Sequence, residues 1–233
     1  EPCWEPLLDG VDWARENVTS IMCSCLATHA LLKRLHGIER QPLPAKKWGV
    51  YSHRVTTKRH PLLREVNTRF DAPHSRFNDI SREQLEAAGL NVLAESDEGG
   101  VLLAASPDQF RVIYFQGHPE YDACSLLKEY KREVVRYARG ERTDAPPLPE
   151  HYFNDETAAM AQELVSLAGD PDRLRARLNA MEPLLDNTWG DSAKAIFNNW
   201  LGLVYRVTDI DRRRPFMDGV DPADPLGLVN GER

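Results

Sequence analysis

The chain has 233 residues, 42% of them hydrophobic and 28% charged, which is typical of a globular protein with a sizeable core. Its net charge of −7 and pI near 5.5 provide no basic field for a polyanion, so we expect no nucleic-acid partner. No apolar run approaches the roughly 18 residues of a membrane span and no secretory signal opens the chain, so we expect a cytoplasmic protein without membrane contact.

The first part of the chain predicts a helix, a strand and a second helix in succession. Residues 7–18 have the spacing of an amphipathic helix, and residues 19–23 favour a strand. Residues 26–36 return to helical spacing and end at the stop signal Gly37. Cys25 therefore falls where a strand becomes a helix.

The middle of the chain predicts a series of strands with one short helix among them. Ser81 and Gln84 have the spacing of a capping box for that helix. After the last strand the chain reads Gln-Gly-His-Pro-Glu-Tyr-Asp at 116–122, and a helix is then predicted over 125–139. The strands are expected at 48–55, 72–76, 91–96, 101–106 and 111–115.

Pro146, Pro147 and Pro149 divide the chain, because prolines in close succession exclude both helix and central strand. We therefore predict a catalytic α/β domain over 1–150. Over 151–233 we predict a helical C-terminal extension that packs on the same domain. Its helices are expected at 156–167, 171–185 and 193–207, followed by about twenty loosely ordered residues.

The cysteines indicate chemistry more than a structural framework. Those at positions 3, 23, 25 and 124 are too few for a disulfide scaffold. At a strand-to-helix junction the sulfur of Cys25 would lie near free backbone N–H groups and the positive helix end, which favour a thiolate. The same N–H groups would form an oxyanion hole, as in a nucleophile elbow. Taken alone, a single cysteine is more often an inert core residue, and this is what we expect of Cys23.

His118 and Glu120 strengthen the case for a reactive cysteine. They follow a predicted strand, and open α/β sheets place their sites at the carboxyl ends of strands. A carboxylate beside a histidine holds one tautomer and stabilises the imidazolium that forms when the base takes a proton. Without Cys25 a polar surface loop would be the better interpretation. With it, a Cys/His/Glu triad is a plausible hypothesis.

Several motifs resemble, in order and spacing, those of the homoserine O-succinyltransferase/O-acetyltransferase family. The most specific are Gly-His-Pro-Glu-Tyr-Asp at 117–122 and Ala-Pro-His-Ser-Arg at 72–76. The resemblance covers most of residues 4–155 and again 188–210. Its other motifs are Thr19-Ser20, Cys25, Leu-His-Gly-Ile at 35–38, Gly-Val-Tyr at 49–51 with His53, Leu-Ala-Glu-Ser at 93–96 and Asn-Asn-Trp at 198–200.

The resemblance implies an α/β fold that is flavodoxin-like and similar to class I glutamine amidotransferases. Such a fold is a three-layer sandwich with a parallel central sheet. The resemblance also implies that Cys25 is the acyl-thioester nucleophile, His118 the general base and Glu120 its orienting partner.

By the same resemblance, Lys46, Ser75 and Arg132 bind substrate. A guanidinium such as that of Arg132 can hold the carboxylate of an amino-acid acceptor with two hydrogen bonds. The implied reaction is ping-pong transfer of a succinyl or acetyl group from coenzyme A to the hydroxyl of L-homoserine, in methionine biosynthesis. Acyl-CoA would be a co-substrate, no cofactor or metal is expected to be bound, and a homodimer is expected.

The chain also departs from the family. Family members carry roughly a hundred more residues, a domain's worth, ahead of its start. The first strands would therefore come from a separate chain, or the sequence is a fragment. Leu26 and His29 replace a usual tryptophan and glutamine, which leaves the acceptor open between homoserine and another hydroxy-amino acid such as serine. Residues 156–187 look like a helical insertion that adds a lid, an oligomer contact or nothing functional.

Two other functions remain open. A glutamine amidotransferase-type amidohydrolase would use the same Cys/His/Glu arrangement to release ammonia, although such enzymes favour glycines around the nucleophile and Cys25 has none beside it. A non-catalytic fragment is the other alternative, which an intact triad makes hard to explain.

Overall fold

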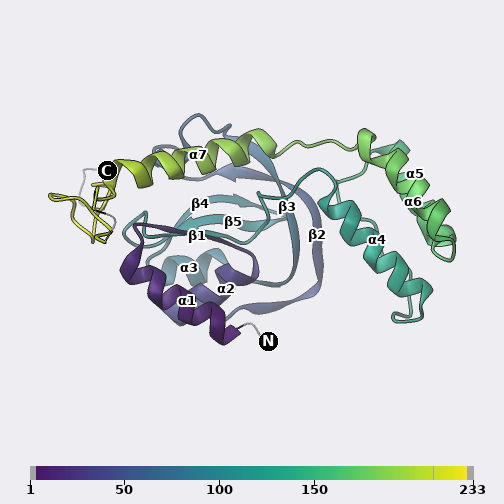
Figure 1. Ribbon diagram of the computed structural model, residues 1–233, viewed down its shortest axis with the longest axis horizontal. Helices are drawn as coiled ribbons and strands as arrows, with labels where there is room; N and C mark the ends of the chain where they lie inside the picture. Colours follow the sequence, from purple (N-terminus) through teal and green to yellow (C-terminus); the bar gives the residue numbers. More distant parts are fainter. Residues whose placement is uncertain (1–3, 212, 230–233) are drawn as a thin grey trace.

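A six-stranded sheet forms the centre of the computed structural model, which describes residues 4–211 and 213–229 (Figure 1). Cys3, one of the four cysteines, lies outside the described residues. The strand order is β1-β6-β5-β4-β2-β3. The strands are β1 (Ile21–Ser24), β2 (Gln41–Val55), β3 (Arg69–Asp79), β4 (Asn91–Ser96), β5 (Gly100–Ala105) and β6 (Val112–Phe115).

The strand directions differ from the expected parallel sheet. Among the described strands, β1 and β6 pair in parallel, whereas β2–β3, β2–β4, β4–β5 and β5–β6 pair antiparallel. Short connections explain the antiparallel β4–β5 and β5–β6 pairs, because consecutive strands joined by a few residues run in opposite directions. The α/β class is confirmed, and the sheet is mixed in its directions.

Helices cover both faces of the sheet and make three layers (Figure 1). On one face lie α1 (Trp4–Asn17), α2 (Leu26–His36) and α3 (Arg82–Ala87). On the other lie the 3₁₀ turn η1 (Pro61–Leu63) and α7 (Gly190–Val207). Successive residues of β6 point to opposite faces, as strand geometry requires. Val112 and Tyr114 join the core under α1–α3, and Ile113 and Phe115 join the core under α7.

Local signals in the sequence correctly predicted where several helices begin and end. Ser81 caps α3 through the Gln84 N–H, and the Gln84 side chain accepts from the Ser81 N–H, which is the predicted capping box. Gly37 ends α2 in the left-handed conformation with φ 68°. A residue without Cβ adopts this conformation at little cost, which explains the stop at this position.

A second core lies beside the sheet, in what we call the helical arm: α4 (Ser125–Ala138), α5 (Asp155–Leu167), α6 (Pro171–Met181) and η2 (Glu182–Leu184). These elements extend from one side of the sheet in Figure 1. They pack around Trp48 of β2 and around Tyr130 and Trp189, both of which are buried. The predicted insertion 156–187 therefore contributes mainly α5 and α6. The division into 1–150 and 151–233 stays a prediction.

The segment after α7 and the lengths of the helices bear on two further expectations. From Thr208 to Val229, the described residues form neither helix nor strand, and Phe216 is buried in a small core beside α7. Within the described part of the chain, no helix combines the length and apolar character that crossing a membrane requires.

Gly49 is where β2 approaches the backbone of Glu150 most closely, through an isolated bridge. A Cβ at this position would lie 2.1 Å from the Glu150 carbonyl oxygen. We predict that Gly49→Ala lowers the free energy of unfolding by about 1–3 kcal/mol, because the two backbones must separate. Urea denaturation measures the change.

Gly10→Ala is the matched control for Gly49→Ala. Gly10 lies within α1, and a Cβ there would meet no atom within 4 Å. Alanine is a better helix former than glycine by up to about 1 kcal/mol, so this variant should be as stable as the original chain or more so. Equal losses in both variants would contradict the close-approach argument.

Candidate active site

Cys25 occupies a sharp turn between β1 and α2. Its backbone has φ 49° and ψ −114°, a conformation that side-chain-bearing residues rarely adopt and that costs on the order of 1–3 kcal/mol. Two hydrogen bonds to the Phe115 carbonyl hold the turn: the Cys25 N–H at 2.8 Å and the Thr28 hydroxyl at 2.7 Å. The strained turn presents Cys25 at the sheet edge, as a nucleophile elbow does.

The start of α2 provides the electrostatics of the elbow. Cys25 is the N-cap residue, and its side chain makes no capping hydrogen bond to the first N–H groups of α2. Such groups favour an anion on the sulfur or on a reacting carbonyl. His29, noted as a departure from the family, is buried and contacts the Gln116 amide oxygen at 3.1 Å. Its role here is therefore in packing and hydrogen bonding inside the sheet.

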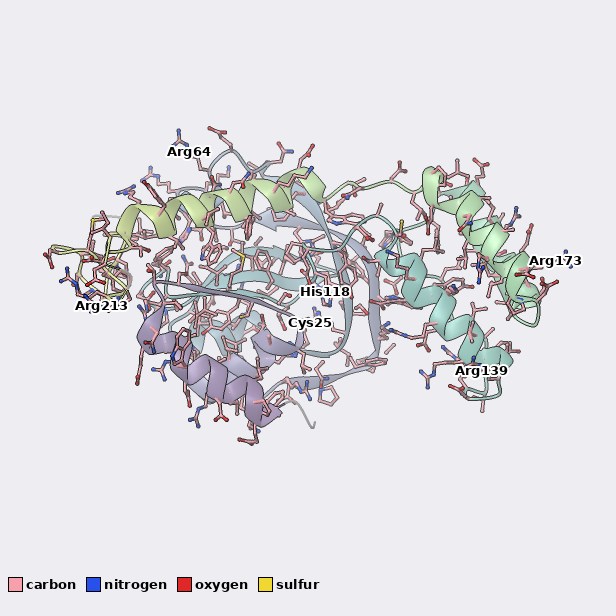
Figure 2. All side chains as sticks on the ribbon, viewed as in Figure 1. Cys25, Arg64, His118, Arg139, Arg173 and Arg213 are labelled. Atoms are coloured by element: carbon pink, nitrogen blue, oxygen red, sulfur yellow. The ribbon has the colours of Figure 1, made fainter. Side chains whose placement is uncertain are left out.

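His118 lies beside Cys25, just beyond the end of β6 (Figure 2). The Cys25 side chain is close enough to His118 to raise the pKa of its imidazole. One ring nitrogen of His118, Nδ1, lies 2.7 Å from Oε1 of Glu120, and Ser24 Oγ donates to the same oxygen at 3.1 Å. Because the ionised carboxylate only accepts, Nδ1 carries a proton and Nε2 faces the sulfur. The structure thus brings together the three residues that the sequence proposed as a triad.

The surroundings of His118 favour its charged form. Burial lowers the pKa of His118, but the hydrogen bonds and charges of Cys25 and Glu120 outweigh burial and raise this pKa to about 9. Burial raises the pKa of Glu120, yet the hydrogen bond from His118 lowers it overall, so Glu120 stays ionised. At neutral pH the site therefore holds an imidazolium between two acceptors.

Two of the three predicted substrate-binding residues meet at Glu129 of α4. Its carboxylate accepts from Ser75 Oγ at 2.6 Å, Lys46 Nζ at 2.9 Å and Tyr121 Oη at 2.7 Å. Burial raises the pKa of Glu129, but these hydrogen bonds lower it overall, which keeps Glu129 anionic. The Ser75 carbonyl lies 3.9 Å from Cys25 Sγ, so this cluster borders the nucleophile.

Arg132, the third predicted substrate-binding residue, lies outside that cluster. Its side chain is 65% exposed, and its nearest ion pair is a 3.8 Å contact with Glu133. It follows Glu129 by three positions on α4, so the two side chains lie on the same side of the helix. The residue that sequence reasoning missed is Glu129. Its only signal was the position of a carboxylate one turn ahead of Arg132.

The other cysteines have different surroundings. Burial raises the pKa of Cys23 to about 12, which leaves this thiol protonated and inert, as predicted. Cys23, Cys25 and Cys124 are all free thiols. Among the residues that the structure describes, no cluster of three or more histidine, cysteine or acidic side chains has the arrangement of a metal site.

An apolar cavity of about 550 Å³ lies next to Glu120 and Ser24. Its size is in the range of small-molecule pockets. Ser24 and Glu120 form one wall, and Phe197 and Trp200 of α7 form another. The Trp200 indole N–H donates to Ser20 Oγ at 2.9 Å, and the Asn199 amide donates to the Leu62 and Arg64 carbonyls. The predicted C-terminal motif thus fastens α7 to the sheet.

The raised pKa of His118 predicts a measurable titration. We expect NMR to give a midpoint near 9 for this imidazole, and lower midpoints in Glu120→Gln and Cys25→Ala because each removes a partner of the imidazolium. Because the pKa in the folded state lies above that of an unfolded histidine, the charge contributes fully to stability below about pH 6.5. That contribution is lost as pH rises through about 9. A wild-type midpoint near 6.5 would contradict the paired arrangement.

Comparison with known proteins identifies the family of this chain. The family model for homoserine O-succinyltransferase matches residues 1–210. A homoserine O-succinyltransferase from Methylococcus capsulatus is 58% identical over 238 residues, covering 98% of this chain and 66% of that protein. One from Nitrosococcus oceani is 57% identical over 235 residues, covering 98% of this chain and 65% of that protein.

Solved structures with a similar course of the chain include a glutamine amidotransferase from Methylobacillus flagellatus. It has a TM-score of 0.48 and 15% identity, and the match covers 86% of this chain and 68% of that one. This chain spans about 65% of the length of the curated relatives. The family model and the sequence identity of these relatives decide the assignment: the chain belongs to the homoserine O-succinyltransferase family.

Proposed function

We propose that this protein transfers a succinyl group from succinyl-CoA to the hydroxyl of L-homoserine through a thioester on Cys25. The observation that carries the proposal is the Cys25–His118–Glu120 arrangement at the sheet edge. Family membership and the names of the relatives favour succinyl over acetyl as the transferred group. The product would feed methionine biosynthesis in the cytoplasm. A homodimer stays a prediction.

In the first half-reaction the Cys25 thiolate attacks the carbonyl carbon of the acyl thioester. The carbonyl oxygen becomes an oxyanion, which the free N–H groups at the start of α2 can stabilise. The intermediate then collapses, the bond to the coenzyme A sulfur breaks, and the His118 imidazolium gives that sulfur its proton. One thioester replaces another, so the step is nearly balanced in free energy.

The second half-reaction uses the change of charge that acylation causes. Once the sulfur is acylated it no longer offers a negative partner to the imidazole, so the pKa of His118 falls from about 9 and the ring becomes a competent base. Nε2 takes the proton of the homoserine hydroxyl as its oxygen attacks the thioester. The thiolate leaves, and O-succinylhomoserine is released. Glu120 holds Nδ1 throughout.

The surroundings of Cys25 also support an amino-acid acceptor. Such a molecule carries an ammonium and a carboxylate beside its hydroxyl. Glu129, anionic and bordering the nucleophile, suits the ammonium, and Arg132, one helical turn further on the same side of α4, suits the carboxylate. Lys46 and Ser75 would fix the Glu129 carboxylate for this contact.

Mass spectrometry of the acylated protein tests the proposed function. After mixing with succinyl-CoA and without an acceptor, we expect one succinyl adduct, located on Cys25 by peptide mapping and removed by L-homoserine. Cys25→Ala should lose the adduct. Cys124→Ala, which removes the free thiol at the start of α4, should keep it.

The same experiment separates the alternatives. An adduct formed from acetyl-CoA in preference to succinyl-CoA would make the protein an acetyltransferase. A glutamyl adduct from glutamine would indicate an amidotransferase. Removal of the adduct by serine but not homoserine would change the acceptor. No adduct from any donor would contradict catalysis through Cys25.

Arg132→Ala tests the proposed carboxylate contact. We expect the KM for homoserine to rise about 10-fold or more, because a charge-assisted hydrogen-bond pair is lost, with little change in the KM for succinyl-CoA. Steady-state kinetics with each substrate varied in turn measure both constants.

Arg136→Ala is the matched control for Arg132→Ala. Arg136 lies one turn further along α4, is about half exposed and pairs with Glu133, as Arg132 does. Its removal should leave both KM values unchanged. An unchanged KM for homoserine in Arg132→Ala would remove Arg132 from the acceptor site.

A further inference from the structure

A row of buried polar side chains lies beneath the site. His53 of β2 and His74 of β3 are completely buried, and Arg76 of β3 is 3% exposed. His74 Nε2 lies 3.1 Å from His53 Nε2, and the Arg76 Nε–H donates to His74 Nδ1 at 3.1 Å. Burying three such groups is costly unless each is hydrogen-bonded, so their arrangement requires a functional or structural reason.

The chemistry of arginine fixes the protons of this row. A guanidinium does not deprotonate in proteins, so Nδ1 of His74 must accept and its proton must be on Nε2. That proton is then donated to His53 Nε2. Arg76 is itself held by the Asp79 carboxylate at 2.6 Å and by the Asn78 and Gly99 carbonyls at 2.9 and 2.6 Å. His74 therefore has one tautomer and one orientation, whereas His53 is held through Nε2 and its buried Nδ1 has no hydrogen-bond partner among the described residues.

The row contacts the backbone that carries the general base. The Pro73 carbonyl, next to His74, accepts from the His118 N–H at 2.8 Å. A Cβ on Gly117 would lie 2.7 Å from that carbonyl oxygen and 3.0 Å from Cε1 of His74. The His74 ring thus packs directly against the Gly117 peptide. The residue after His74 in the chain is Ser75, which contacts Cys25 and Glu129.

Charge gives a second reason for this arrangement. The charged and titratable groups that face His74 are Arg76, His53, His118 and Lys47, and burial together with these groups lowers the pKa of His74. The edge of the Tyr51 ring also packs on it. A second cation under His118 would oppose formation of the imidazolium. The Arg76 donor prevents this, because it occupies the nitrogen that a proton would need.

We propose that His53, His74 and Arg76 are positioning residues: together they fix the backbone of residues 73–75 and thereby the place where His118 meets Cys25. The inference rests on the proposed acyl transfer, since the residues act through the proposed general base. The β2–β3 ladder already pairs residues 73–75, and an apolar row of the same volume would fill the space but would add no directional bonds to orient the side chains against the Gly117 peptide. Histidine bonded at both nitrogens supplies such bonds.

The test compares His74→Leu with His74→Gln. Leucine removes both hydrogen bonds, whereas the glutamine amide can still accept from Arg76 and donate to His53. The readout is the rate of Cys25 alkylation by iodoacetamide as a function of pH, which reports the thiolate–imidazolium pair without any transferase reaction. In His74→Leu we expect alkylation of Cys25 near neutral pH to slow, because the sulfur loses its aligned imidazole partner.

Turnover should follow the same order. We expect kcat for succinyl transfer to fall about 10- to 100-fold in His74→Leu, with a much smaller change in the KM for succinyl-CoA. His74→Gln should restore most of the alkylation profile and of kcat. Arg76→Lys, which keeps the charge but loses the fixed fork of donors, should be intermediate. Circular dichroism confirms that each variant is folded, and the conservative pair His74→Gln and Arg76→Lys decides the outcome if His74→Leu does not fold.

His60→Gln is the matched control. His60 is also a buried imidazole, held by the Gln109 carbonyl and the Leu62 N–H, but it lies at the opposite end of β6 from His118. Its loss should lower the melting temperature without moving the alkylation profile. An unchanged profile in His74→Leu, or an equal shift in His60→Gln, would overturn the inference. If the His74 variants change Cys25 alkylation as expected but the wild-type protein transfers no acyl group, the proposed function is refuted and the positioning role stands.

Discussion

The parallel pairing of β1 with β6 is the constraint on which the rest of the site depends. Its register sets Ser24 opposite Phe115, so both strands end at the same edge of the sheet. The residues that follow each strand are therefore neighbours, although 92 positions separate Cys25 from Gly117 in the sequence. The ladder also continues into the elbow, because the Cys25 N–H bonds to the last carbonyl of β6. Backbone hydrogen bonding thus brings Cys25 and the loop that bears His118 to one place, and side-chain contacts then set their approach.

The two carboxylates near Cys25 have separate tasks because their partners differ. Glu120 is half exposed and has a histidine as its principal partner, so it can follow the charge of that ring through a reaction cycle. Glu129 is surrounded by a hydroxyl, an ammonium and a phenol, and none of these partners is a histidine. It offers a permanent negative charge. This division suits a reaction in which one group cycles its proton while another holds a cationic substrate in place.

Much of this architecture follows from local sequence, and the remainder depends on contacts that no local pattern encodes. Helix and strand periods, the capping box and the Cys25 junction all predicted the correct elements, because they depend on neighbours in the chain. Strand direction did not, since it depends on which strands pair. β2 begins at Gln41, earlier than Pro42 and Pro44 suggested, because a register shift between Pro42 and Lys47 accommodates them. Glu129 and Arg76 look like ordinary charged residues until packing buries or surrounds them.

One of the hydrogen bonds that join the helical arm to the site has a wider consequence for the protein. Trp189, buried in the arm's core, donates its indole N–H to the carbonyl of Tyr121, whose ring stacks on His118 at 4.2 Å between centroids. α4 contributes Leu126, Leu127 and Tyr130 to that core and also carries Glu129, which contacts Ser75 and Tyr121. The arm and the reacting groups therefore constitute one cooperative unit, in which local opening of α5 and α6 releases the loop that bears the imidazole while the sheet remains intact.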